Sequence, residues 1–321
     1  CKLEPAVATT PACGSTGDCA WEAWRLAVGG ELGGHVEVQW GHQLVGFKEG
    51  EGEGGELSFQ IEAEGKGELK HAKADLVVGA DGIRSSVRRL LIGEDASPLR
   101  YLGCIVILGI CPLGAIEGTE GLDRSLLDSA TVFQTANGNE RMYMMPYASD
   151  SVMWQLSFPM SEKEAKALSA QGTHALKEEA CRRCQWHDPI PQILAATLEA
   201  QVSGYPVYDR ALLESELLEK GAQVTLIGDA AHPMSPFKGQ GANQALLDAL
   251  ALARGITRGC RPLSEWRKTG VRKSVLTEFE SEMLERSATK VRGSAEAAQF
   301  LHSDIVLHEG DEPRGRCLKR K

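Results

Sequence analysis

The sequence predicts an α/β fold in two pieces, separated by an inserted antiparallel β-sheet. Two short apolar runs, at 75–80 and 223–227, each lead through a glycine-containing turn into a helical pattern, which is typical of α/β domains. Between them, residues 100–160 alternate strand-like runs with turn signals, as an antiparallel meander does. The two α/β pieces can bury a shared sheet only together, so we expect them to form one domain around the insertion.

The expected boundaries follow these changes of pattern. The first α/β part covers 1–98, of which 1–20 is irregular, and the antiparallel-sheet domain covers 99–207. Residues 208–303 complete the α/β domain and add a C-terminal helix, and 304–321 form a flexible tail. A chain of 321 residues is long enough for two such cores.

Composition excludes several function classes. The net charge is -9 and the isoelectric point is near 5.5, which argues against a nucleic-acid partner. The longest apolar stretch, Tyr101 to Ala115, is interrupted by glycine and proline and is too short for a membrane span. Nine cysteines make an odd, scattered set, and Cys181 and Cys184 lack a second pair, so we expect neither a disulfide framework nor a metal site.

The start of the chain suggests a missing segment. Its first residue is Cys1 instead of Met, and no secretory signal is visible. We therefore expect a reduced, cytoplasmic setting by default, with any N-terminal targeting segment upstream of Cys1.

Elements of the first piece can be predicted in order. Residues 21–32 are expected to form a helix and 36–40 a strand. An acidic, glycine-rich turn at 49–56 leads into a half-buried strand at 57–63. The strand at 75–80 is buried and precedes a helix from Ser85 to Ile92.

The insertion and the second piece follow. Residues 131–147 form a hairpin around Asn137-Gly138, 152–158 form a further strand, and 161–183 are helical. After the strand at 223–227, a helix covers 241–257, and its apolar positions 246, 247, 250 and 253 are expected to face the core. A last amphipathic helix covers 273–302.

The first motif that indicates chemistry runs from Asp75 to Arg88. Gly79 and Gly82 permit close backbone approach or positive φ, and the helix that opens at Ser85 presents N–H groups suited to an anion such as a pyrophosphate. The alternative is an ordinary strand-turn-helix corner in which Asp81 caps the helix.

The second motif runs from Val224 to Asp248. Its strand ends at Gly228-Asp229, where α/β sheets bind ligands, and a carboxylate there can accept hydrogen bonds from sugar or polyol hydroxyls. Gly239 and Gly241 remove side chains from the start of the next helix, whose positive end can stabilise negative charge. The alternative interpretation of this segment is a buried helix with a glycine-rich start, which does not explain the full length of the motif.

Together the motifs resemble the class A FAD-dependent monooxygenases, which include para-hydroxybenzoate and salicylate hydroxylases and tetracycline-inactivating oxygenases. The resemblance implies a Rossmann-like FAD/NAD(P)-binding domain interrupted by a substrate-binding sheet. It places the cofactor pyrophosphates near Asp81, Gly82 and Arg84, and the flavin ribitol near Gly228 and Asp229. It implies that the isoalloxazine ring is lined by Pro236, Gly239, Gly241, Ala242 and Asn243.

One departure from the family concerns its opening βαβ unit, whose G-x-G-x-x-G holds the FAD pyrophosphate and adenosine. We expect the sequence to lack this motif, because Gly29-Gly30 and Gly33-Gly34 lie on the wrong element and follow no strand. The family's arginine near this helix aligns with Trp21, four residues before Arg25. We therefore expect an incomplete FAD site that lacks its adenosine end.

The resemblance implies that NAD(P)H reduces FAD, and that the reduced flavin and O2 hydroxylate an aromatic or polycyclic small molecule. No catalytic side chain stands out, and His232 is interpreted as a locally satisfied loop histidine in preference to a base. Candidates to line the substrate pocket are Tyr143, Met144, Trp154 and Gln155, of which alternation directs half away from it.

Two alternatives remain open at this point. The chain could be a truncated or inactive flavin-fold protein that does not bind FAD alone. It could also be a flavin oxidoreductase of another reaction type, although the Trp-x-Trp-x-Ile-Pro signature of halogenases is absent. Nothing in the sequence predicts an oligomeric state or distinguishes NADH from NADPH.

Overall fold

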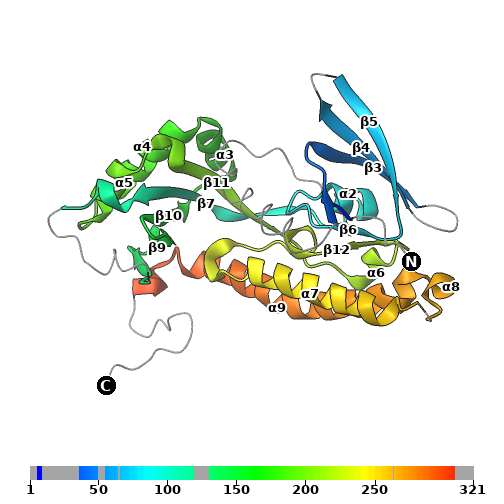
Figure 1. Ribbon diagram of the computed structural model, residues 1–321. Coiled ribbons are helices and arrows are strands. Elements are labelled where there is room, and N and C mark those ends of the chain that lie inside the picture. The colour runs from blue at the N-terminus through cyan, green and yellow to red at the C-terminus, as the bar shows by residue number, and fades with distance from the viewer. Residues whose placement is uncertain are drawn as a thin grey trace. The chain divides into compact units, whose positions relative to one another are not determined.

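The computed structural model describes residues 6–8, 36–49, 55–63, 66–118, 130–262 and 264–307 (Figure 1). The chain divides into two compact units, which are described separately below. Unit 1 comprises Cys1–Leu99 and Asp209–Arg292, and unit 2 comprises Arg100–Tyr208 and Gly293–Lys321. The expected assignment of these regions to cofactor and substrate stays a prediction.

Unit 1 is built on a parallel pair of strands, β6 (Val77–Gly79) and β12 (Val224–Leu226). Both predicted strands are confirmed, and all three residues of β12 are buried. The first strand is less buried than expected, because Val78 of β6 is exposed. A second parallel pair joins β1 (Ala6–Ala8) to β2 (Val36–Val38), so the expectation of an irregular segment at 1–20 is wrong for residues 6–8, whose pairing with β2 decides their conformation. The predicted helix at 21–32 lies outside the described residues, and β2 ends before Trp40, which is in a turn.

An antiparallel sheet of three strands adjoins this part of the chain. It contains β3 (His42–Glu49), β4 (Gly55–Ala63) and β5 (Lys66–Ala74), with β4 in the centre. The predicted strand after the acidic turn is confirmed as β4, and it pairs with β3, which was not predicted. Residues 50–54 of the turn lie outside the described part. Sequence reasoning missed β5, because its lysine-rich sequence has little strand propensity and its pairing with β4 decides its conformation.

Helices complete unit 1, and Figure 1 shows α7 and α9 running side by side. The predicted helices are confirmed as α2 (Ser86–Ile92), α7 (Gly241–Gly259) and α9 (Thr277–Phe300), of which α9 belongs to unit 1 as far as Arg292. The shorter elements are α6 (Ser215–Leu218), α8 (Trp266–Val271), a π-helix at Arg272–Leu276, and 3-10 turns at Gly228–Ala230 and Pro236–Lys238. Side chains from β6, β12, the π-helix and α9 form the core, including Val77, Leu226, Leu276 and Met283.

The predicted core face of α7 is wrong. Leu246, Leu247 and Leu250 are 69%, 44% and 46% exposed, and Ala253 is exposed as well. The buried face carries Gln244, Asp248 and Leu252. Polar side chains can occupy that face because they are paired there with groups from distant segments, which the helical period of apolar residues does not reveal.

Unit 2 centres on a five-stranded sheet in the order β11-β7-β10-β9-β8. The strands are β7 (Leu99–Pro112), β8 (Phe133–Ala136), β9 (Arg141–Ala148), β10 (Ser151–Pro159) and β11 (Val202–Arg210). The predicted hairpin is confirmed: Gly138 has a φ of 90°, and the Asn137 side chain accepts hydrogen bonds from the N–H groups of Asn139 and Glu140. Strand β11 was not predicted.

Three helices supply the core of unit 2 together with the sheet. They are α3 (Glu162–Ala170), α4 (Thr173–Arg183) and α5 (Ile190–Ala196), of which α5 was not predicted. The expected single helix at 161–183 is two helices, because Gly172 adopts a φ of 90° between them. Short 3-10 turns lie at Leu113–Ala115, Glu199–Gln201 and Asp304–Leu307. No helix in the described part of the chain has both the length and the apolar character needed to cross a membrane.

Candidate functional site

The loop after β12 is held tightly against helix α7. Gly228 has a φ of 56°, and a Cβ atom placed on it would lie 3.0 Å from the Cβ of Ala245. Its N–H donates a hydrogen bond of 2.8 Å to Asp248 Oδ2. Glycine is therefore required at this position for both its conformation and its close approach to the helix.

Asp229 presents a carboxylate next to the start of α7. The residue is exposed, and no described residue forms a hydrogen bond or ion pair with its side chain. A Cβ atom placed on Gly241 would lie 3.8 Å from Asp229 Oδ1. Partial desolvation by surrounding protein atoms raises the pKa of this carboxyl above its ordinary value, and nearby His232 opposes the rise. The carboxylate is available to accept hydrogen bonds from a ligand's hydroxyl groups.

The N-terminus of α7 is open. Its N-cap residue, Gln240, makes no side-chain hydrogen bond to the first turn, so the first N–H groups of this 19-residue helix have no side-chain cap. Gly239 is left-handed with a φ of 58°, and Ala242 and Asn243 are exposed on the first turn. Pro236 begins the preceding 3-10 turn. The open helix end provides positive potential beside the Asp229 carboxylate.

Asp248 is the buried anchor of this arrangement. Its carboxylate accepts hydrogen bonds from the Gly228 N–H, from His232 Nε2 at 2.7 Å and from the Arg286 guanidinium at 2.8 Å. Burial alone would raise the pKa of Asp248, but the hydrogen bonds from His232, Gly228 and Arg286 outweigh it and hold the pKa below its ordinary value. Because the carboxylate is ionised, the Nε2 of His232 carries the proton that it donates.

Sequence reasoning missed Asp248 and Arg286 as supporting residues. Arg286 also donates to the Gln244 side chain at 2.8 Å, so it joins both polar residues of the buried α7 face. The available signal was the pair of polar residues four positions apart, Gln244 and Asp248, in the otherwise apolar run 244–253.

In the first motif, Asp81 is engaged in capping α2. Its carboxylate accepts hydrogen bonds from the N–H groups of Ser86 at 2.7 Å and Val87 at 3.2 Å, and from the Ser85 hydroxyl. Gly82 has a φ of 77° and Arg84 is exposed. The Asp81 carboxylate is thus engaged in hydrogen bonds within its own turn. Gly82 and Arg84 are the predicted site residues of this turn that remain available to a ligand.

Arg88 connects the two motifs, and sequence reasoning missed it. The side chain is buried, and its Nη1 donates to the carbonyl oxygens of Ala230 at 2.8 Å and Ala231 at 2.9 Å. Burial and the charge of Arg210 lower the pKa of Arg88 to about 10, so the guanidinium stays charged at neutral pH. Helix α2 is thereby fixed to the loop that carries Asp229.

Arg210, at the end of β11, holds the turn of the first motif from the other side. Its Nε donates to the carbonyl oxygen of Ile83 at 2.9 Å, and its Nη1 lies 3.0 Å from Glu94. The same guanidinium donates to the carbonyl of Ser97. The turn that contains Gly82 and Arg84 is therefore fixed by a buried arginine.

The four residues predicted to line a substrate pocket divide between the two faces of the unit 2 sheet. Met144 and Trp154 are buried in the core, and Trp154 Nε1 donates to Thr197 Oγ1 at 2.9 Å. Tyr143 and Gln155 are directly opposite one another across β9 and β10 and are half-buried on the other face. Only these two remain candidates.

The residues present fit one end of an FAD molecule. Asp229 and the open α7 end match the needs of a ribitol chain and an electron-rich ring edge. The expected absence of G-x-G-x-x-G spacing is wrong, because glycines 50, 52 and 55 have this spacing. Gly50 and Gly52 come between β3 and β4 in the sequence, and Gly55 is the first residue of β4. Because β3 and β4 pair antiparallel, these glycines do not link a strand to a helix, as a pyrophosphate site of this type requires.

Comparisons with known proteins show the family to which the chain belongs. Residues 26–261 match the family described as FAD binding domain. The chain is 31% identical over 185 residues to the aurachin C monooxygenase/isomerase of Stigmatella aurantiaca, covering 58% of this chain and 43% of that protein. It is 29% identical over 231 residues to the 3-amino-4-hydroxybenzoate 2-monooxygenase of Streptomyces cremeus, covering 72% and 51%. The chain thus spans about half the length of these relatives.

Among solved structures, Klebsiella pneumoniae HpxO complexed with FAD and uric acid superposes with a TM-score of 0.67 at 20% identity, covering 89% of this chain and 64% of that one. This likeness confirms the predicted fold, an α/β domain interrupted by an antiparallel sheet. The resemblance predicted from the two motifs is confirmed as well. The chain belongs to the FAD binding domain family, together with the FAD-dependent monooxygenases.

Proposed function

We propose that this chain forms the flavin-binding part of an FAD-dependent monooxygenase that uses NAD(P)H and O2 to hydroxylate an aromatic or polycyclic small molecule. The observation that carries the proposal is the Asp229 carboxylate, which has no partner among the described residues and lies beside the open start of α7. Membership of the FAD binding domain family and the names of the relatives support it.

The proposed roles follow from the chemistry of each group. Asp229 accepts hydrogen bonds from ribitol hydroxyls, and Gly228 allows its loop to lie against α7. The first turn of α7, with Gly239, Gly241, Ala242 and Asn243, lies along the ring edge that becomes negative on reduction, and Pro236 fixes the approach. Bound FAD supplies the redox chemistry, which is the transfer of electrons from NAD(P)H to O2.

The remaining assignments are also proposals. Gly82 and Arg84 contact the pyrophosphate side of the cofactors, with Asp81 ordering their turn. The sheet face that bears Tyr143 and Gln155 contacts the substrate, where an aromatic ring and an amide can position a flat, polar molecule. We place this activity in the cytoplasm.

The experiment uses riboflavin, because it contains the ring and ribitol and lacks the adenosine part. We expect the 321-residue chain to quench riboflavin fluorescence in a saturable manner. Asp229→Asn should weaken binding about tenfold, since it replaces a charged acceptor with a neutral one. Asp95→Asn, which changes an exposed aspartate in the same unit, should bind riboflavin like the original chain.

A chain that does not bind riboflavin, or an Asp229→Asn variant that binds it unchanged, would contradict the proposed site. The reaction is tested separately: with added FAD, phenolic acids should stimulate NADH or NADPH oxidation. If riboflavin binds and no phenolic acid stimulates oxidation, the flavin site stands and the aromatic substrate class is wrong.

A further inference from the structure

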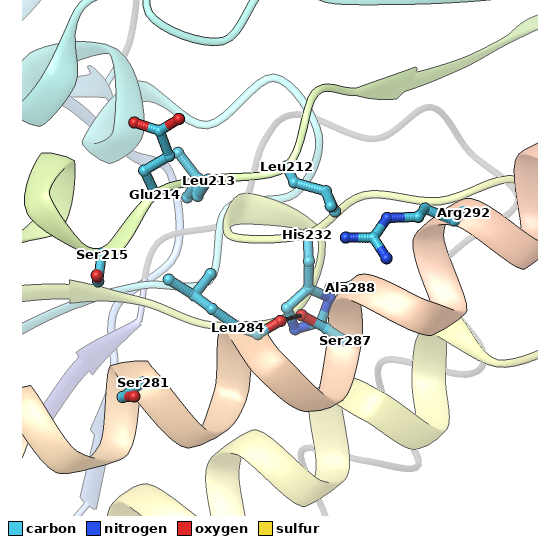
Figure 2. Close-up of a pocket in the computed structure, with 10 residues that line it drawn as sticks. All are labelled: Leu212, Leu213, Glu214, Ser215, His232, Ser281, Leu284, Ser287, Ala288 and Arg292. Carbon is cyan, nitrogen blue, oxygen red and sulfur yellow. Dashed lines mark hydrogen bonds between the residues drawn. The ribbon is translucent and has the colours of Figure 1, made fainter.

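A cavity of about 430 Å³ lies within unit 1, on the side of the Gly228–His232 loop that faces α9. We call it the His232 pocket, and Figure 2 shows its lining. Leu212, Leu213 and Leu284 contribute apolar side chains, and His232 and Arg292 contribute nitrogen donors or acceptors. None of the flavin-site residues proposed above lines it, so the pocket is separate from that site.

His232 offers the pocket a hydrogen-bond acceptor that is fixed in place. The residue is 4% exposed, and its Nε2–H is committed to the ionised carboxylate of Asp248. With Nε2 as the donor, the uncharged form of the ring has its lone pair on Nδ1, and this atom is buried with no hydrogen-bond partner in the described part of the chain. A buried acceptor without a partner is costly, and a ligand O–H donor would satisfy it.

Arg292 offers a cation at the same end of the pocket. Figure 2 shows its guanidinium extended from α9 toward His232. The residue is exposed, and none of the described residues forms an ion pair with it. Arg286 lies on the same helix, and its charge is matched by Asp248. Arg292 therefore presents a positive charge at this end of the pocket with no ion-pair partner among the described residues, which favours an anionic ligand group there.

The three features specify one class of ligand. We propose that the His232 pocket binds a small hydroxylated carboxylic acid, whose carboxylate pairs with Arg292, whose hydroxyl donates to His232 Nδ1, and whose apolar body contacts the leucines. The planar fork of an arginine suits a carboxylate, and leucine side chains suit an aromatic or aliphatic frame. The exposed Glu214 carboxylate lies at the far end of the pocket, where it disfavours a second anionic group (Figure 2).

The probe is 3-hydroxybenzoate, whose hydroxyl is too far from its own carboxylate to bond with it. Titration into the full chain should shift the imidazole carbon-bound proton signals of His232 in a saturable manner. Arg292→Gln should weaken binding at least about tenfold through loss of a charge-assisted pair. Lys290→Gln removes the same charge from an exposed position on the same helix and should change the affinity less than twofold.

Benzoate is the matched ligand control, because it lacks the hydroxyl group. It should bind about tenfold more weakly than 3-hydroxybenzoate, since it leaves Nδ1 unpaired. Riboflavin binding by Arg292→Gln should equal that of the original chain, which separates this site from the flavin site. Absence of a saturable His232 shift, equal effects of Arg292→Gln and Lys290→Gln, or equal affinity for both acids would each overturn the proposal.

Discussion

At the scale of single residues, burial decides which polar groups hold the site and which remain free to bind. Asp248 and Asp229 are both carboxylates close to His232, yet they differ in partners. Asp248 is fully buried and accepts three hydrogen bonds, whereas Asp229 is exposed with no partner among the described residues. A buried, satisfied carboxylate stabilises the loop, and an unsatisfied one at the surface is available to a ligand.

Replacement of Asp248 should therefore reduce stability strongly. Asp248→Asn leaves Arg286 without its buried counter-charge and His232 without its ionised acceptor, so we expect the free energy of unfolding in urea to fall by about 3–5 kcal/mol. Asp150→Asn, at an exposed position of unit 2, should change it by less than about 0.5 kcal/mol.

The same prediction has a pH readout with a definite sign. The pKa of Asp248 is lowered in the folded protein, so its contribution is complete above the ordinary aspartate pKa of about 4 and is lost as the pH falls through the folded value. The original chain should lose stability more steeply below pH 4 than Asp248→Asn does. Parallel acid-unfolding curves for the two proteins would contradict this account.

At the scale of elements, close packing explains positions that hydrophobic patterns do not. Gly79, the last residue of β6, lies between β12 and α2. A Cβ atom there would come within 2.6 Å of Leu226 Cδ2 and 2.8 Å of Val87 Cβ. The absence of a side chain at Gly79 thus allows β6 to pack closely against both β12 and α2.

Gly79→Ala should force these elements apart. We expect a loss of about 1–3 kcal/mol in the free energy of unfolding, measured by urea denaturation, because the clash involves branched side chains in a core. Gly114→Ala is the control, since no atom lies within 4 Å of a Cβ placed there and its φ is not positive. Equal stabilities of the two variants would show that β6 and α2 can shift freely.

Local patterns predicted most elements of the fold. The strands before both motifs, the Asn137-Gly138 hairpin and helix α7 all have signals within a few residues. Strand β5 has no such signal, because its pairing partner determines it. The family motif also indicated the candidate site loop, but Arg88 and Arg286 act on it across long sequence separations, which a linear pattern does not reveal.

At the scale of the whole molecule, the chain passes from unit 1 to unit 2 at Leu99–Arg100 and returns at Tyr208–Asp209. Within unit 1 the two crossing segments are tied together, since Arg210 donates to the Ser97 carbonyl and the Ser97 hydroxyl donates to the Ala211 carbonyl at 3.0 Å. The insertion therefore leaves and rejoins unit 1 at one place, which is how a domain can be inserted without disrupting its host.

The exposed leucines of α7 should dominate the solution behaviour of the chain. Leu246 and Leu250 lie one helical turn apart on the exposed side of α7, beside Leu247. We expect the double change Leu246→Gln and Leu250→Gln to reduce self-association in analytical ultracentrifugation and to raise solubility.

The stability of this double variant provides the check. Because both side chains are exposed, its free energy of unfolding should stay within about 1 kcal/mol of the original. A larger loss would mean that these leucines pack against other protein groups. Leu252→Gln, on the buried face of the same helix, should instead lower the free energy of unfolding by about 3 kcal/mol, because it buries a polar group.

The bond from Arg88 to the carbonyls of Ala230 and Ala231 has a consequence for protein engineering. Arg88 and these two carbonyl groups are more than a hundred residues apart in the chain. A chimera that takes only the 224–248 segment from a relative therefore combines Arg88 of this chain with carbonyl groups of the relative. The grafted loop keeps its geometry only when the relative that supplies it also has an arginine at the position equivalent to Arg88. The two motifs therefore have to be exchanged together, although the sequence of a whole antiparallel sheet lies between them.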